Sequence, residues 1–286
     1  MQEFRMSRST LAQDETLDLR ARQLVAAALG AAFADSRPSS GVEPTAATAK
    51  LLRSAWRLVA APHRRLSAGD LGPGEVPPGE VDFGPVIRWL QLDSNRRQRA
   101  RQHVFGLVIS RRCPPCETEY LPSRDVFHRA QQLADIAGFY HAFGLEPNRR
   151  HPRRADHVAL ELEFVSLLLE KLATVGDGTQ AEEHTRIARA ALAAFLEDHL
   201  TTWVPIFGQR VAEHASAVAA ALTDQDACRD TRLLAGVARV LCAWIVTERR
   251  CAGLAPPRGL MVLDPVRLGE SDAGCEACEV CPEQPR

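Results

Sequence analysis

Cysteine thiols at a spacing that can bind a metal ion occur twice in this chain of 286 residues. Cys113 and Cys116 are separated by two prolines, and Cys275, Cys278 and Cys281 follow near the end. A C-x-x-C spacing brings two sulfurs within reach of one metal ion or of each other. The second group resembles the start of an iron–sulfur ligand run, although no fourth cysteine completes it. One hypothesis is a zinc or iron–sulfur site built from both groups, and the other is that these thiols have no defined role.

The same C-x-x-C pair, Cys113 and Cys116, has the spacing of a redox dithiol. A dithiol of the thioredoxin type needs a strand before it and a helix after it. Here the sequence predicts a helix before the pair and a loop after it. The pattern therefore disfavours a redox dithiol.

Carboxylates on an apolar helix are the next candidates for chemistry. Glu161 and Glu163 interrupt a segment that otherwise reads as buried, so each needs a cation or a hydrogen-bond donor as a partner. The partner is either an arginine of this chain or an arginine of a bound peptide. Asp156 follows four arginines in 149–154 and is expected to cap the helix that starts there.

Catalytic motifs are missing. The chain has no G-x-S-x-G elbow, no phosphate-binding loop, no dinucleotide fingerprint and no H-E-x-x-H. Glu197-Asp198-His199 is the nearest approach to a catalytic group, and its position at a predicted helix end favours a solvated surface cluster. We therefore expect a protein that is not an enzyme.

Composition narrows the classes further. The net charge is −1, from 35 Lys+Arg and 36 Asp+Glu, so charge gives no case for nucleic-acid or membrane binding. No apolar run of about 18 residues occurs, and the polar start lacks the apolar stretch of a secretory signal. The sequence predicts a cytoplasmic protein without a transmembrane helix.

The elements that must position these residues are helices. No convincing alternating strand pattern occurs, and Gly/Pro breaks separate segments with helical spacing. We predict one all-α domain over 14–250, a flexible N-terminus over 1–13 and a cysteine-containing tail over 251–286. Helices are expected at 17–33, 46–61, 95–110, 123–143, 156–172, 180–198, 202–222 and 227–250, with a short apolar piece at 86–92 and a Gly/Pro-rich loop at 67–84.

Three helices carry more detailed expectations. In 46–61, Leu51, Leu52, Trp56 and Leu58 are expected to face inward. Helix 123–143 is amphipathic, with Ser123 or Asp125 as its cap and Gly144 at its end. Its stripe of His128, Gln131 and Asp135 is either a solvated face or a wall that contacts a partner. Helix 156–172 is apolar on most sides and is expected to be central.

Two stretches of the chain resemble a known family. Residues 117–146 hold a Glu-x-x-Tyr segment, Glu117 to Tyr120, before a helix that ends in the run Ala137 to Gly144. Residues 153–172 hold Asp156-His157 followed by Leu160 to Phe164 (LELEF). Together they resemble the TorD/NarJ-type redox-enzyme maturation chaperones, especially those of molybdenum dehydrogenases in the DMSO reductase superfamily. This chain departs from the family in having Ala155 where a proline is usual and Cys116 where an aromatic residue is common.

The resemblance implies a TorD-like helical bundle without catalysis. Such proteins bind the apo catalytic subunit of a molybdopterin oxidoreductase, often at its twin-arginine signal peptide, until the cofactor is inserted. We expect this chain to need no cofactor, apart from a possible zinc or iron–sulfur site at the cysteine groups, and to be a monomer or a dimer. The implied partner-binding residues here are Glu119, Tyr120, Phe127, Tyr140, Asp156, His157, Glu161 and Glu163.

Elementary chemistry makes this site reasonable. Carboxylates such as Glu119 and Asp156 can pair with guanidiniums. An apolar groove near Phe127, Tyr140 and Phe143 would hold the rest of the signal peptide. Two other classes stay open, namely a metal-binding redox accessory protein that uses the cysteines and a helical scaffold without a specific client.

Overall fold

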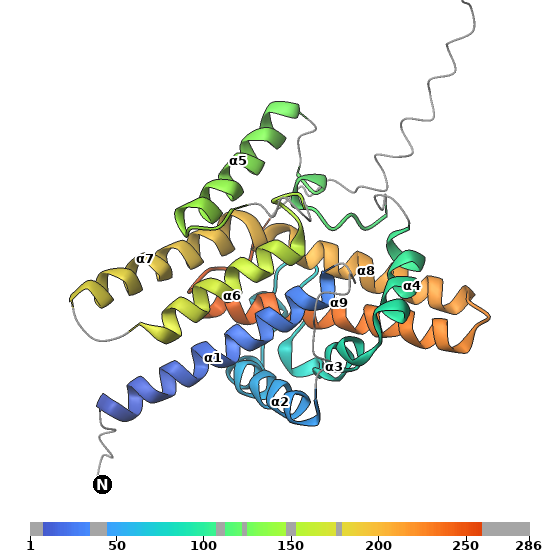
Figure 1. The fold of residues 1–286 in the computed structure, drawn as a ribbon, viewed down its shortest axis with the longest axis horizontal. Helices are drawn as coiled ribbons and strands as arrows, with labels where there is room; N and C mark the ends of the chain where they lie inside the picture. The colour runs from blue at the N-terminus through green and yellow to red at the C-terminus, as the bar shows by residue number, and fades with distance from the viewer. Residues whose placement is uncertain are drawn as a thin grey trace, which may run out of the picture.

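Helices make up the regular structure of the protein (Figure 1). The computed structural model describes residues 8–34, 45–106, 112–121, 125–146, 153–175 and 179–258. Within these ranges the only β-type pairing is an isolated bridge between Cys116 and His157. The prediction of an all-α fold is confirmed. None of the helices in these ranges combines the length and apolar character that crossing a membrane requires.

Two helix pairs form the centre of the bundle. Helix α1 (Arg8–Phe33) packs against α6 (Val158–Thr174), and α8 (Thr201–Ala221) packs against α9 (Gln225–Cys251). An aromatic contact between Phe33 and Phe207 joins α1 to α8. Helix α6 is buried on most sides, as predicted. The second half of α9 is equally central, because nearly every residue from Val237 to Arg249 is buried.

Shorter helices cover this centre. Helix α2 (Ala46–Ala60) lies on α1, while α3 (Gly84–Gln91) and α4 (Ser94–Phe105) lie on α9. Helix α7 (Thr179–Phe195) packs on α6 and continues into a π-helical segment, Leu196–Leu200. Helix α5 (Val126–Ala142) projects from the bundle in Figure 1, and Ile136 is its one fully buried residue.

Helix ends follow local signals. Asp125 caps α5 by accepting from the Phe127 N–H at 2.9 Å, and Gly144 ends the helix with φ of 78°, as predicted. Helix α4 stops at Phe105, earlier than the predicted end, because Gly106 takes a φ of 77°. Helix α1 begins at Arg8 and so reaches into the segment that the sequence predicts to be flexible.

The expected inward face of α2 is partly wrong. Leu52 and Trp56 are buried, but Leu51 and Leu58 are exposed. The buried face also contains Val59 and three alanines, namely Ala49, Ala55 and Ala60. Alanine is small enough for either face, so the leucines alone did not define which side packs on α1.

Two buried ion pairs join distant parts of the chain to α9. Arg249 donates to Glu75 Oε1 and Oε2 at 2.8 and 2.9 Å, and also to the carbonyls of Asp70 and Leu254. It thereby anchors the Gly/Pro-rich loop 67–84 on α9. Arg22 of α1 donates to Glu248 at 2.7 Å. Both carboxylates are fully buried, so each guanidinium is required to keep a buried charge paired.

Candidate partner-binding site

The two stretches that carry the family resemblance meet in space. The short 3₁₀ turn η4 (Glu117–Glu119) lies against the start of α6. The Glu117 N–H donates to the Asp156 carbonyl at 2.9 Å, and the Val158 N–H donates to the Pro115 carbonyl at 2.9 Å. A backbone pairing around Cys116 and His157 therefore holds the two segments together.

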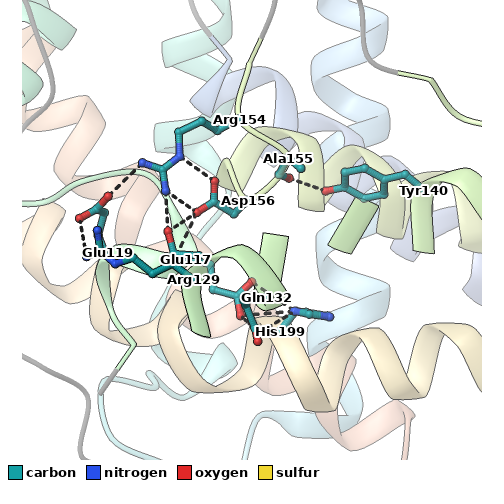
Figure 2. Close-up of polar contacts among 10 residues, drawn as sticks. Glu117, Glu119, Arg129, Gln132, Tyr140, Arg154, Ala155, Asp156 and His199 are labelled. Atoms are coloured by element: carbon teal, nitrogen blue, oxygen red, sulfur yellow. Dashed lines mark hydrogen bonds and ion pairs between the residues drawn. The ribbon is translucent and has the colours of Figure 1, made fainter. Parts of the chain in front are cut away.

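A chain of charged groups covers this junction (Figure 2). Asp156 is completely buried and accepts from the Thr118 N–H and hydroxyl at 3.1 and 2.8 Å. Arg154 donates to both Asp156 oxygens at 3.0 and 2.8 Å, and to Glu119 at 2.9 Å. Arg129 of α5 contacts the other Glu119 oxygen at 3.4 Å. Arginines of this chain thus already pair with Glu119 and Asp156.

Asp156 does not cap α6, contrary to the sequence prediction. The N-cap is His157, whose Nδ1 accepts from the Ala159 N–H at 3.1 Å. Asp156 points the other way and is held by Thr118 and Arg154. Arg154, two residues before Asp156, pairs with its buried carboxylate, and this pairing takes the place of the cap.

A second polar cluster joins α5 to the π-helical segment (Figure 2). Gln132 donates to Glu117 at 2.7 Å, and His199 Nδ1 lies 3.2 Å from Glu117. The other ring nitrogen of His199 lies 3.3 Å from Asp135. Burial raises the pKa of Glu117, while the contact with His199 opposes that rise. Asp135 therefore contacts the body of the protein. A fully solvated stripe of His128, Gln131 and Asp135 does not describe this residue.

His199 corrects the expectation of a solvated Glu197-Asp198-His199 cluster, because its ring is fully buried. It packs against Phe139 and Phe195, with ring centroids 5.6 and 5.0 Å away. The π-helical segment adds about one residue to a helical turn, which rotates the following side chains by about 100°. Sequence reasoning missed His199 for this reason, and it missed Gln132 because its contacts with Glu117 and His199 join distant segments, although Glu117 already belonged to the segment that carries the resemblance.

Glu161 lies completely buried beside these groups. The Trp203 indole and the Glu117 carboxyl are close enough to act on it, but neither Glu161 oxygen has a hydrogen bond of normal geometry within the described residues. Burial raises the pKa of Glu161 well above its ordinary value, and the neighbouring Glu117 raises it further. The expectation that an internal arginine pairs with Glu161 is wrong for the described residues. The Glu161 carboxyl group instead avoids an unpaired buried charge by staying protonated, because an unpaired buried carboxylate is more costly than a neutral acid.

Glu163 differs from Glu161 although it is two residues away. It is exposed, and its aliphatic stem lies against α1, since a Cβ on Gly30 would be 3.4 Å from Glu163 Cγ. Partial burial of the carboxyl raises the pKa of Glu163, and Arg153 acts in the opposite direction. Glu163 is therefore accessible to a partner.

The aromatic candidates do not line one groove. Tyr140 packs on Phe164 and donates its hydroxyl to the Ala155 carbonyl at 2.9 Å, and Phe143 also packs on Phe164. Phe127, at the other end of α5, is 85% exposed. Tyr120 is buried in the core against Trp203. The expectation of one groove near Phe127, Tyr140 and Phe143 is therefore wrong, because Phe127 lies apart from the other two residues.

Helix α5 presents one continuous apolar face to solvent instead. We name it the α5 outer face, and it consists of the exposed residues between Val126 and Gly138 that fall within about a third of the helix circumference: Val126, Phe127, Ala130, Ala134, Ala137 and Gly138. None of these residues is charged. A helix normally turns such a face toward the protein core.

Only two of the five cysteines predicted to bind a metal ion lie within the described residues. Cys275, Cys278 and Cys281 lie outside the described residues, so the proposed metal site stays a prediction. Cys113 and Cys116 are buried and form no disulfide. Burial raises the pKa of Cys116 to about 12, which disfavours the thiolate that metal or redox chemistry needs. Within the described residues, no three His, Cys, Asp or Glu side chains gather as metal ligands would.

Known proteins resemble part of this chain. Residues 85–209 match the family described as nitrate reductase delta subunit. The selenate reductase assembly chaperone protein of Thauera selenatis is 39% identical over 90 residues, which is 31% of this chain and 43% of that protein. The chlorate reductase assembly chaperone protein of Ideonella dechloratans is 36% identical over 80 residues, 28% of this chain and 39% of that protein.

A third relative matches over a longer stretch. The chaperone protein TorD of a Psychrobacter species is 29% identical over 112 residues, 38% of this chain and 46% of that protein. The chain thus spans less than half the length of each of these relatives, and no solved structure matches it. The relatives are named as chaperones rather than catalysts, in agreement with the prediction that the chain is not an enzyme. The resemblance to the TorD/NarJ-type redox-enzyme maturation chaperones is therefore confirmed for the central part of the chain, which carries the candidate site.

Proposed function

We propose that this protein is a maturation chaperone that binds the apo catalytic subunit of a molybdopterin oxidoreductase and holds it until the cofactor is inserted. The observation that carries the proposal is the α5 outer face, an uncovered apolar surface inside the family-matched residues 85–209. Exposed apolar helix faces mark sites where a partner binds. The relatives named as assembly chaperones make an immature enzyme subunit the partner of choice.

The α5 outer face fits an apolar helical segment of the client. Small residues at Ala130, Ala134 and Gly138 lie one turn apart and let another helix approach closely. Phe127 then acts as an anchor at the end of this track, since aromatic side chains dominate the energetics of interfaces. The apolar stretch of a twin-arginine signal peptide has the right character for this track.

The charged cluster beside α5 fits the arginines of such a peptide. Asp156 and Glu161 are buried, so Glu119 and Glu163 are the acidic candidates that a partner can reach. Arg129 contacts Glu119 at 3.4 Å, a longer contact than the 2.9 Å from Arg154. A client guanidinium would replace Arg129 on Glu119 and keep that carboxylate paired.

A substitution at the anchor tests the proposal. Phe127→Asp should weaken binding of the apo catalytic subunit at least tenfold, because it places a charge on the apolar track. Stability should change little, since the side chain is largely exposed and an aspartate is favourable in the first turn of a helix. The measurement is the Kd of the purified apo-subunit by calorimetry, with the unfolding midpoint in urea as a check.

The matched control is Leu51→Asp, which introduces the same charge at an exposed apolar residue of α2. This control should leave the Kd within about twofold. Equal losses in both variants would show a general charge effect and contradict the site. If Phe127→Asp instead turns a dimer into a monomer while the Kd stays the same, the α5 outer face binds a second copy, and the proposed client site is wrong.

A further inference from the structure

A cavity of about 500 Å³ lies between α3 and the first two turns of α9, away from the α5 outer face. It is lined by Pro85, Arg88, Gln225, Cys228, Arg229, Arg232 and Leu233. Its volume is in the range of small-molecule sites. We propose that this cavity binds a phosphate ester, with the three guanidiniums holding the phosphate.

The cavity is built by close helix contact. Gln225, Arg229, Arg232 and Gly236 recur at spacings of three and four on one face of α9. A Cβ on Gly236 would lie 2.6 Å from Pro85 Cβ, so the start of α3 rests almost on the α9 backbone. Arg88 follows Pro85 by one turn and lines the cavity together with Arg229 and Arg232.

The residues that line the cavity include three arginines and no carboxylate. Arg229 donates to Asp226 at 2.9 Å, and Asp230 is occupied by Arg96 at 2.7 Å. Neither Arg88 nor Arg232 has a hydrogen bond or ion pair within the described residues. Asp82, the carboxylate near Arg88, accepts from the Gly84 N–H. Two guanidiniums are therefore available to an anion, with Arg229 able to add a third.

The chemistry of the lining selects the ligand class. Guanidiniums present paired donors that match phosphate oxygens, and no carboxylate lines the cavity. Pro85 and Leu233 add apolar surface at which the organic part of an ester can pack. The amides at the α9 N-terminus contribute little, because Asp224 already accepts from the Asp226 and Ala227 N–H groups.

The test is calorimetric titration of the full chain in phosphate-free buffer of low ionic strength, with pyrophosphate, adenosine diphosphate and adenosine as probes. We expect one saturable site for pyrophosphate, at least equal affinity for adenosine diphosphate, and no binding of adenosine. The Arg88→Gln/Arg232→Gln double variant should bind both phosphates at least tenfold more weakly. The matched control is Arg53→Gln/Arg57→Gln, which removes two exposed arginines of α2 and should stay within twofold.

Several outcomes would overturn the proposal. These are the absence of saturable phosphate binding, an equal loss in the control, or adenosine binding as tightly as its diphosphate. Weaker binding of the diphosphate than of pyrophosphate would also contradict an ester site. A hexaglutamate peptide that binds at least as tightly as pyrophosphate would assign the cavity to acidic protein segments. Arg53, Arg57, Arg88 and Arg232 are all exposed, so neither double variant should change the circular dichroism spectrum. The proposal does not rest on the chaperone function, and its failure would leave that function untouched.

Discussion

Replacing Arg249 with methionine is expected to lower the free energy of unfolding by about 3–5 kcal/mol, because it leaves a buried carboxylate without its cation. Glu75 is fully buried and receives two hydrogen bonds from Arg249. The same guanidinium also holds the carbonyls of Asp70 and Leu254. Its loss therefore releases the loop 67–84 from α9. Urea unfolding followed by circular dichroism measures the change.

Two comparisons identify the cause of that loss. Arg250→Met removes the neighbouring arginine, which is partly exposed and contacts Asp70 at 3.4 Å, and should cost less than about 1 kcal/mol. The double variant Arg249→Met/Glu75→Gln should be less destabilised than the sum of its single variants, because the unpaired charge has gone. Strict additivity of the two effects would contradict the role assigned to this pair.

The second large effect concerns pH and Glu161. The folded protein raises the pKa of Glu161 well above its ordinary value, so the folded state holds this proton more tightly than the unfolded chain does. Stability from this group is therefore full at a pH below the ordinary glutamate pKa of about 4.3 and is lost as the pH rises toward the folded value. Each unit of pKa difference contributes about 1.4 kcal/mol.

Glu161→Gln should remove this loss, because an amide keeps the shape of the protonated acid but cannot ionise. We expect the variant and the wild type to have similar stability near pH 4, and the variant to be increasingly more stable toward pH 9. The measurement is urea unfolding across that pH range. Glu170→Gln removes an exposed carboxylate from the same helix and serves as the control. A difference between Glu161→Gln and wild type that does not grow with pH would show that Glu161 is already ionised in the folded protein.

The sequence predicted the helices well where apolar residues fill one face. Helices α5, α6 and α9 begin and end within a few residues of their predicted bounds. The cap at Asp125 followed from a short polar side chain just before an apolar run. These features depend on neighbours in the chain, so local reasoning is sufficient for them.

The site was harder to predict because its groups depend on contacts between distant segments. The pairing of Asp156 with Thr118 joins residues 38 positions apart, and local rules favoured a helix cap. His199 is buried because a π-helical segment changes the register of its helix, which no spacing pattern reveals. The outward direction of Phe127 could not be foreseen either, because an apolar face on a helix ordinarily turns to the core.

The most direct test of the chaperone proposal compares two forms of the client. The catalytic subunit of a molybdopterin oxidoreductase from the same organism is prepared without its cofactor and with it, and the Kd of this protein for each form is measured by calorimetry. We expect the apo form to bind at least tenfold more tightly, and Phe127→Asp to remove this preference. Equal affinity for both forms, or no binding to either, would contradict it.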